Sequence, residues 1–344
     1  MKQNITMAYQ LTPRTDLPAA VLAAIEKCAF GTKPNRYGVT TLLQPIQQTL
    51  LKRRYADEIV ETPDEQIWRL FGSAFHKVLE IGAEEIGGIQ LEQYIRITVL
   101  DRIVGGVIDL HIDDDSINDY KVTKAWSLLN QSRIDDWVMQ LNIYRYIMFK
   151  DTGKLVSNLR IVAFFRDWER KFTSNEKYPQ KKLMWYDLPV LPLEEVEEFI
   201  VSKVRELVAN ESLPDAELTP CTAEEMWEHP TQYALYKERK VKGEWTANKT
   251  ATRVFDAEDQ VAGYTRSVKT PLKAGERWMV QVRPGRRVRC EGVFDGGDTY
   301  CPVAHKCAQH KAYLESKGKC NGCVEKGNCS GCKGSACKGN CNCR

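Results

Sequence analysis

Two periodicities of apolar residues run along the chain to about residue 210 and predict helices and strands in a definite order. Apolar positions 67, 70, 71, 74, 75, 78 and 79 recur with the period of an α-helix, which predicts a helix over residues 63–81. Thr62 is the expected N-cap, with Pro63 as the first residue and Glu65 completing a capping box. His76 and Glu80 lie four residues apart on this helix, so they share one face.

Strand-like alternation follows this helix. It predicts strands near residues 94–100, 102–112 and 116–121, and the turn at 113–115 joins the last two as a hairpin. A helix over residues 132–149, a strand over 159–165 and an amphipathic helix over 193–209 complete the pattern. This order predicts an α/β fold with a mixed central sheet flanked by helices.

Beyond Cys221 the pattern is weaker. It predicts a short helix over residues 256–264 and a strand over 278–282 that ends at the turn Pro284-Gly285. From Gly318 onward the chain consists almost wholly of small and polar residues and cysteine, so this tail is expected to be disordered unless metal orders it. The predicted domains are an N-terminal segment (1–37), a core (38–215), a cysteine-containing accessory region (216–317) and the tail (318–344).

The charge of the chain adds little to these predictions of fold and domains. The chain of 344 residues has a net charge of +3, which favours no class of partner. Basic clusters occur at Lys52-Arg53-Arg54 and at Arg283, Arg286, Arg287 and Arg289, but such clusters are usually solvated surface. The N-terminus lacks the apolar stretch of a signal peptide, and no segment approaches the roughly 20 apolar residues of a membrane span. We therefore expect a cytoplasmic protein with no membrane partner, located in the host cytoplasm if a phage encodes it.

Three polar residues give the predicted hairpin its candidate chemistry. Asp109 lies within an apolar strand, where an unpaired carboxylate is costly, and Asp119 and Lys121 are two apart and project from the same face of the next strand. A hard cation such as Mg²⁺ or Mn²⁺ takes one or two carboxylates from a protein and fills its remaining positions with other oxygens. A lysine beside such a cation can orient an attacking hydroxide or stabilise charge on a phosphate. The pattern therefore favours metal-dependent hydrolysis of phosphodiester bonds.

Four short segments in this order resemble the RecB-like branch of the PD-(D/E)XK nucleases, which includes CRISPR-associated and phage-encoded exonucleases. The matching segments are residues 72–80 (GSAFHKVLE), 106–109 (GVID), 119–121 (DYK) and 140–144 (QLNIY). They are similar to the family's histidine helix, G-x-x-D strand, D-Y-K strand and Q-x-x-x-Y helix. Each match is weak alone, but their order and their expected placement on helix, strand, strand and helix make the joint signal strong. The resemblance covers roughly residues 38–210.

The resemblance implies a restriction-endonuclease-like core and a metal centre. His76, Asp109, Asp119 and the carbonyl of Tyr120 would hold one or two Mg²⁺ or Mn²⁺ ions. Lys121 would act on the nucleophilic water, so that Asp109, Asp119 and Lys121 form the catalytic set.

The resemblance also implies roles for residues around this centre. Gln140 and Tyr144 would line a DNA channel and contact a phosphate or a stacked base. Glu80 would support His76 without contacting the metal itself.

The cysteines are distributed unevenly, because eleven of the twelve lie at or after Cys221. In a reducing cytosol, clustered cysteines more often bind metal than form disulfides. Members of the resembled branch often hold an iron–sulfur cluster with one N-terminal and three C-terminal cysteines. Cys301 and Cys307 keep the spacing of the family's last two ligands, and Cys290 is the candidate for the first of the three.

The expected N-terminal cysteine is missing, since Gln44 stands in its place. Either Cys221 or Cys28 must then substitute, and Cys221 is preferred because it directly follows the last helix of the predicted core. The set of Cys221 with the three C-terminal cysteines would hold a [4Fe–4S] cluster or a tetrahedral Zn²⁺ ion. Buried thiols without a metal are the alternative.

The sequence thus predicts a metal-dependent DNA exonuclease that acts on single strands or duplex ends in recombination, repair or phage DNA processing. DNA is the expected substrate, and a recombination or helicase protein is a candidate partner. Two alternatives stay open: a catalytically degenerate DNA-binding module, and a zinc-dependent nucleic-acid-binding protein whose cysteines carry the function. The presence together of Asp109, Asp119 and Lys121 argues against the first of these.

Overall fold

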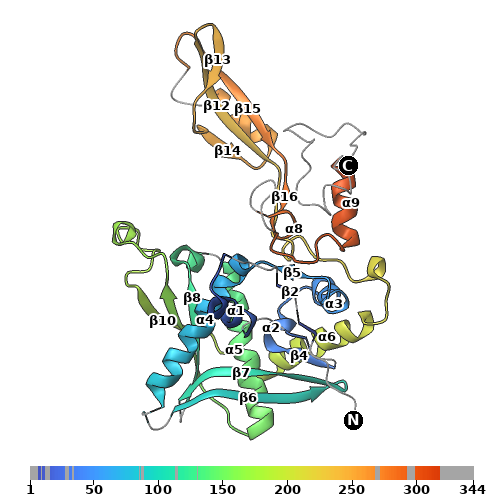
Figure 1. Cartoon of the computed structure of the whole chain (residues 1–344). Helices are drawn as coiled ribbons and strands as arrows, with labels where there is room; N and C mark the ends of the chain where they lie inside the picture. Colours follow the sequence, from blue (N-terminus) through green and yellow to red (C-terminus); the bar gives the residue numbers. More distant parts are fainter. Residues whose placement is uncertain are drawn as a thin grey trace. The chain divides into compact units, whose positions relative to one another are not determined.

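The structure is a computed structural model of the chain, and contacts divide it into two compact units, Met1–Thr219 and Pro220–Arg344 (Figure 1). It describes residues 7–8, 10–11, 16–27, 31–32, 35–84, 86, 89–112, 115–129, 131–267, 272–292 and 299–317. Cys28, the centre of the predicted turn at 113–114 and the tail at 318–344 lie outside the described residues. The side chain of Glu65, and with it the predicted capping box, lies outside them as well.

The first unit is built on a six-stranded mixed sheet with helices against it, which confirms the predicted fold class. Its strands are β4 (Arg36–Gly38), β6 (Ile89–Val99), β7 (Arg102–Ile112), β8 (Ser116–Thr123), β9 (Asn158–Phe165) and β10 (Leu183–Leu188). The order across the sheet is β10-β9-β8-β7-β4, with β6 on the other edge of β7. Strands β8 and β9 run parallel, as do β4 and β7, and the remaining pairs are antiparallel.

Two long helices contact this sheet and carry the predicted motifs. They are α4 (Pro63–Ala83), which includes His76, and α5 (Gln131–Thr152), which includes Gln140. The helix α4 packs Phe75 against Phe164 of β9, on the face that also carries Tyr120. Side chains alternate between faces along a strand, and Gln140 of α5 contacts the neighbouring residues of β8, so α5 lies against the opposite face.

Further elements complete the first unit. The helices are α1 (Ala19–Lys27), α2 (Val39–Leu42), α3 (Ile46–Arg54) and α6 (Leu193–Asn210), and the 3₁₀ turns are Ala125–Leu129, Arg170–Phe172 and Asp215–Glu217. The short strands are β1 (Met7–Ala8), β2 (Gln10–Leu11), β3 (Gly31–Thr32) and β5 (Val60–Glu61). The core contains fully buried Tyr37, Ile108, Leu141 and Ile147.

Strand β7 has a divided edge that positions the candidate site. One of its edges pairs with β6 along its whole length, from Ile89↔Ile112 to Val99↔Arg102. The other edge pairs with β4 at residues 103–105 and with β8 at residues 110–112. Between these two stretches the sheet opens, and Asp109 lies at the opening.

The second unit contains a four-stranded antiparallel sheet and one helix against it. Its elements are β11 (Glu228–His229), β12 (Gln232–Val241), β13 (Glu244–Ala247), β14 (Arg253–Phe255), α7 (Glu258–Ser267), β15 (Glu276–Arg283), β16 (Arg286–Arg287), α8 (Val288–Glu291) and α9 (Ala308–Ser316). Strand β12 is central and pairs with β13, β14 and β15. Helix α7 packs Val261 and Tyr264 on a small core with Leu235, Phe255 and Trp278.

The predicted long elements of the first unit are present with shifted ends. The greatest shift is at β6, which begins at Ile89 instead of near residue 94. Strands β10 and β12 to β14 were not predicted from the sequence. No helix in the described part of the chain combines the length and the apolar character needed to cross a bilayer.

Candidate metal centre

The two aspartates of the candidate site lie across from each other where two strands separate. The last described pair of β7 and β8 is Leu110↔Asn118, so Asp109 and Asp119 occupy the next position of this antiparallel register. Directly opposed residues of an antiparallel pair project from the same face, and like charges placed there repel. The described ladder ends at this point.

At the end of this ladder, the side chain of Asp109 takes the place of a backbone hydrogen-bond partner for Tyr120. The amide N–H of Tyr120 donates to Asp109 Oδ2 over 3.0 Å. In a strand, the N–H and C=O of one residue point to the same side. The carbonyl of Tyr120 is therefore directed to the same edge of β8 as this amide, where Asp109 lies.

Asp119, Lys121 and Gln140 form a closed polar triangle on the other side of β8. Lys121 Nζ lies 2.5 Å from Asp119 Oδ2 and donates to Gln140 Oε1 over 3.2 Å. The Nε2 group of Gln140 donates to Asp119 Oδ1 over 3.2 Å. A single glutamine of α5 thus orients both charged side chains of the D-Y-K segment.

The environment of Asp119 disfavours its negative charge. Burial raises the pKa of this carboxyl, the ammonium of Lys121 opposes the rise, and the carboxylate of Asp109 adds to it. The residue is only 4% exposed, and its Oδ2 is paired with the Lys121 ammonium. A buried carboxylate near a second carboxylate is a place where a divalent cation would be stabilised, because the cation offsets both negative charges.

His76 reaches the same centre from α4, and Glu80 pairs with a lysine of the same helix. His76 Nδ1 lies 3.4 Å from Asp109 Oδ1, and its ring meets the Tyr120 ring edge to face at 6.0 Å. Glu80 forms an ion pair with Lys77 at 2.6 Å, one turn along the same helix. The support of His76 by Glu80 stays a prediction.

Tyr144 is seated against a glycine of β7. A Cβ atom placed on Gly106 would lie 2.8 Å from Tyr144 Cε1, so only glycine fits at this position without displacement. Gln140 and Tyr144 are each 6% exposed. They lie beneath the surface of the site, and the structure gives them positioning contacts, while their predicted contact with DNA stays a prediction.

The four predicted cysteine ligands all belong to the second unit and are thiols, not disulfides. Burial raises the pKa of Cys221 and of Cys290 to about 12, and the neighbouring thiolates of Cys301 and Cys307 contribute to both increases. Cys221 and Cys290 therefore each lie within electrostatic range of Cys301 and Cys307. The backbone N–H of His310 also donates to Cys307 Sγ at 3.4 Å, and Gln309 binds both backbone groups of Cys221.

Neither the residues around Asp109 and Asp119 nor the four cysteines form a closed ligand shell. In the part of the chain that the structure describes, no three or more histidine, cysteine, aspartate and glutamate side chains are placed so that they could hold a metal ion as they stand. The donor types suit two different metals, because carboxylates with a carbonyl suit Mg²⁺ or Mn²⁺ and four thiols suit zinc or an iron–sulfur cluster. Binding at either place would require the donors to close around the ion.

Several arginines of the basic clusters noted in the sequence form hydrogen bonds and ion pairs within the fold. Arg54 binds Asp215 and three backbone carbonyls at the end of α6. In the second unit, Arg287 pairs with Glu228 at 3.3 Å and Arg289 donates to the carbonyl of Glu225. These arginines stabilise the fold and provide little free charge for a ligand.

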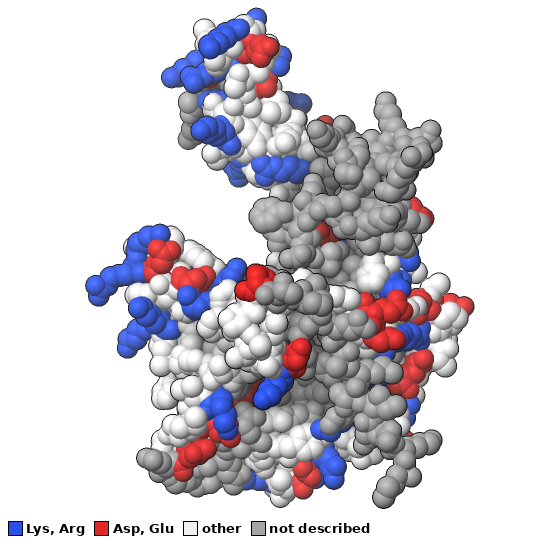
Figure 2. Space-filling model, viewed as in Figure 1, with Lys and Arg blue, Asp and Glu red and all other residues white. Residues whose placement is uncertain are grey.

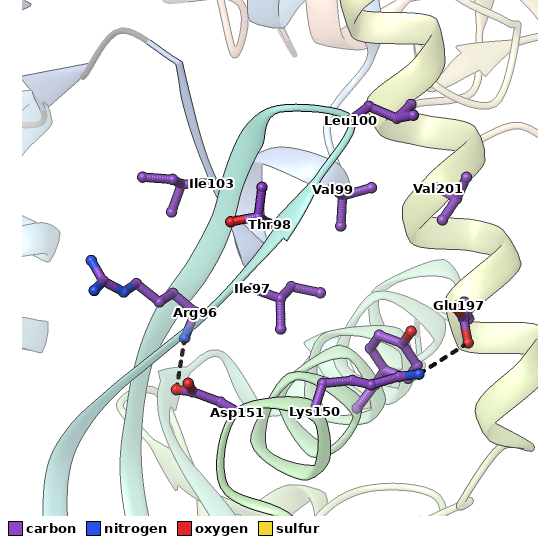
Figure 3. A pocket seen from close by; sticks show the side chains of 11 residues that line it. Arg96, Ile97, Thr98, Val99, Leu100, Ile103, Lys150, Asp151, Glu197 and Val201 are labelled. Atoms are coloured by element: carbon purple, nitrogen blue, oxygen red, sulfur yellow. Dashed lines mark hydrogen bonds and ion pairs between the residues drawn. The ribbon is translucent and has the colours of Figure 1, made fainter.

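A cavity of about 820 Å³ lies between β6, α5 and α6 and contains none of the predicted metal ligands (Figure 3). The ion pair of Lys150 with Glu197 spans it at 3.6 Å, and the amide of Arg96 donates to Asp151 at its rim. Its lining also includes Thr98 and Tyr146, together with aliphatic side chains such as Ile97 and Val99 of β6. The cavity is therefore separate from the candidate metal centre.

Several solved structures resemble the chain distantly, although no family model and no curated protein matches its sequence. The structure of SSO0001 matches at a TM-score of 0.39 and 15% identity, over 57% of this chain and 86% of that protein. A candidate exonuclease of Eubacterium rectale matches at 0.29 and 15%, over 42% of this chain and 56% of the other. An alkaline exonuclease of Laribacter hongkongensis, also known in complex with dAMP, matches at 0.33 and 12%, over 51% and 89%. These scores are too low to establish a common fold, so the geometry of the site has to support the function.

Proposed function

We propose that this protein is a metal-dependent deoxyribonuclease of the RecB-like type that degrades single-stranded DNA or duplex ends as an exonuclease. The observation that carries the proposal is the meeting of four separated segments at one opening of the sheet. His76, Asp109, Asp119 and Lys121 lie in mutual electrostatic reach there, with Gln140 holding the last two.

The chemistry follows from the donor set. Asp109, Asp119, His76 and the Tyr120 carbonyl would hold Mg²⁺ or Mn²⁺, and an ion held there lowers the pKa of a coordinated water and offsets charge on the phosphate. Lys121 presents its ammonium beside Asp119 and would donate to the phosphate oxygen or to the attacking water. Gln140 is a positioning residue, because it fixes Lys121 and Asp119 without reaching the reacting atoms itself.

The test is degradation of end-labelled single- and double-stranded DNA with Mn²⁺ or Mg²⁺ by the wild type, Asp119→Asn and Lys121→Ala. We expect both variants to lose at least about a hundredfold in rate, which is the usual effect of removing a charge-stabilising group from a catalytic site. Asp187→Asn is the matched control, because Asp187 is a surface aspartate of β10 with 72% side-chain exposure. Its rate should equal that of the wild type.

The degenerate DNA-binding module remains the alternative from a different functional class. A wild type that binds DNA but cleaves none with any divalent metal would favour this alternative. Unchanged cleavage by Asp119→Asn would also overturn the proposed site. The position of the label in the products would give the polarity of digestion.

We also propose that Cys221, Cys290, Cys301 and Cys307 hold a structural metal centre in the second unit, a [4Fe–4S] cluster or Zn²⁺. The support is that these four thiols lie in one compact unit, are buried or half-buried, and lie within electrostatic range of one another. The zinc-dependent nucleic-acid-binding protein would instead use the C-terminal cysteines, so truncation before Gly318 with nuclease activity intact would argue against it.

Anaerobic purification followed by iron, sulfide and zinc analysis tests this centre. Cys307→Ser and Cys221→Ser should lose the metal, whereas Cys28→Ser should keep it. The reverse pattern for Cys221 and Cys28 would transfer the fourth ligand to Cys28. Absence of iron and zinc from the wild type would leave four unliganded thiols.

A further inference from the structure

The sheet of the second unit concentrates positive charge. Residues 232–283 contain eleven lysines and arginines against six aspartates and glutamates, a net charge of +5. The whole chain carries only +3, so the rest of it has a net charge of −2. Figure 2 shows the blue side chains gathered over the region of β12, β13 and β15. None of the four motifs of the candidate nuclease site lies here.

The two faces of this sheet differ. On one face, α7 covers Leu235, and the neighbouring Lys237 lies over the Trp278 ring at 5.3 Å. The other face carries the alternate residues of β12 and their cross-strand partners. We call it the open face and define it by Tyr236, Lys240, Trp245, Arg277, Gln281 and Arg283.

Cations and aromatic rings are interleaved on the open face. Arg277 lies over the Trp245 ring at 4.1 Å, and Lys240 approaches the same ring from the next strand at 5.6 Å. Further along, Arg283 donates to the hydroxyl of Tyr236 over 2.7 Å. The face therefore presents two pairs of an aromatic ring and a guanidinium group.

These side chains are accessible. Trp245 is 37% exposed, and the side chain of Arg277 is 52% exposed although it pairs with Glu238 at 2.8 Å. Lys240, Gln281 and Arg283 are also exposed. Two acidic groups accompany these cations: Glu238 pairs with Arg277, and Asp256 accepts a hydrogen bond from the side chain of Gln232, which lies opposite Arg283.

We propose that the open face of the β12–β15 sheet binds single-stranded nucleic acid, with the cations on phosphates and Trp245 stacked on a base. The geometry of the face carries this inference, and only the assignment of the nucleic acid as DNA rests on the proposed function. Sequence-independent binding of single strands combines a positive surface with exposed aromatic rings, because every base offers a face for stacking. A membrane surface or an acidic protein would also be attracted by the charge, but the interleaving of cations and rings matches the alternation of phosphates and bases along a single strand.

The experiment measures the anisotropy of a labelled oligothymidylate of about 20 nucleotides, with the full chain in buffer freed of divalent cations. The double variant Lys240→Gln/Arg283→Gln removes two charges from the open face. We expect the slope of log K against log salt to become shallower by about 1.4 and the affinity to fall at least about tenfold. Trp245→Ala should weaken binding about tenfold, and Trp245→Tyr should restore most of it.

Lys237→Gln/Arg239→Gln is the matched control, because it removes two charges from the covered face of the same strand. We expect this control to bind within about twofold of the wild type, since its charges do not contact the phosphates. Equal losses from both double variants would mean that net charge alone attracts the oligonucleotide, and the proposal would fall. A duplex that binds as tightly as the single strand, with no effect of Trp245→Ala, would overturn it as well.

Circular dichroism and thermal melting of each variant show whether the sheet remains folded. Trp245→Tyr is a second control for correct folding, because it keeps an aromatic ring at this position. Binding without divalent cations does not depend on cleavage. If the open-face variants bind the oligonucleotide as the wild type does while cleavage is intact, only the nucleic-acid-binding inference is rejected. If binding depends on the open face but the wild type cleaves no DNA, only the proposed nuclease is rejected.

Discussion

Among single residues, the contact between Gly106 and Tyr144 ties strand β7 to helix α5 beside the candidate metal centre. In Gly106→Ala the new Cβ would lie 2.8 Å from one Tyr144 carbon and 3.1 Å from its hydroxyl oxygen. We expect the free energy of unfolding to fall by about 1–3 kcal/mol, as measured by urea denaturation. Gly82→Ala is the control, since nothing lies within 4 Å of its added Cβ and a helical alanine gains about 0.5–1 kcal/mol over glycine.

The buried carboxylate of Asp119 gives a second prediction at this scale, with a readout independent of cleavage. Mn²⁺ should raise the melting temperature of the wild type, because a cation bound to the folded state alone stabilises that state. At about a hundredfold excess over its Kd the expected rise is about 5–10 °C. Asp119→Asn should lose this rise and Asp187→Asn should keep it. An equal rise in all three proteins would place the ion elsewhere.

Among the elements, the β6–β7 hairpin contains a turn that its residues do not favour. Leu100 and Asp101 both adopt positive φ angles, 47° and 58°, in the two-residue loop between Val99 and Arg102. Such type I′ turns favour asparagine and glycine, and a bulky residue in this region costs about 1–2 kcal/mol. Leu100→Asn should therefore raise the free energy of unfolding by about 1 kcal/mol.

Leu155→Asn is the matched control for this turn. Leu155 is 45% exposed against 47% for Leu100, and its φ angle is negative. Its replacement should change the unfolding free energy by less than about 0.5 kcal/mol. Equal effects of the two substitutions would mean that removal of an exposed leucine, and not the backbone conformation, is responsible.

The sequence predicted the elements of the first unit that bury a regular stripe of apolar residues. Helix α4, strands β7 to β9 and helices α5 and α6 belong to this class. The register of the β7–β8 hairpin could also be worked out from the sequence, because the predicted turn at 113–115 sets which residues pair. With Ile112 opposite Ser116, residue 109 falls opposite residue 119, which brings the two aspartates together.

The elements that the sequence did not predict have physical reasons. Strand β12 alternates clearly only at Tyr233 and Leu235 and then continues as charged residues, because its second half extends beyond its small core. The signal that could have revealed it is the pair Lys242-Gly243, whose positive φ angles of 52° and 89° form the tight turn to β13. Strand β10 is half-exposed throughout, so it lacks the apolar density of a central strand.

For the whole molecule, the division into two units separates the two candidate metal sites. The carboxylate centre belongs to Met1–Thr219, and all four described cysteines belong to Pro220–Arg344. We expect urea denaturation to show two transitions, because each unit has its own core. Cys307→Ser should shift one transition and Gly106→Ala the other, as followed by far-ultraviolet circular dichroism. One transition shifted by both variants would show that the units unfold together.

The divided edge of β7 makes one backbone amide a reporter on the site. The N–H of Tyr120 is protected by the Asp109 carboxylate instead of a strand partner, so its rate of hydrogen–deuterium exchange follows the position of that carboxylate. A cation or nucleotide that draws Asp109 away would expose this amide, whereas those of the paired residues Ser116 and Asn118 would keep their protection. Occupancy of the centre could thus be followed at one position of the backbone, without a labelled substrate and without a chromophore.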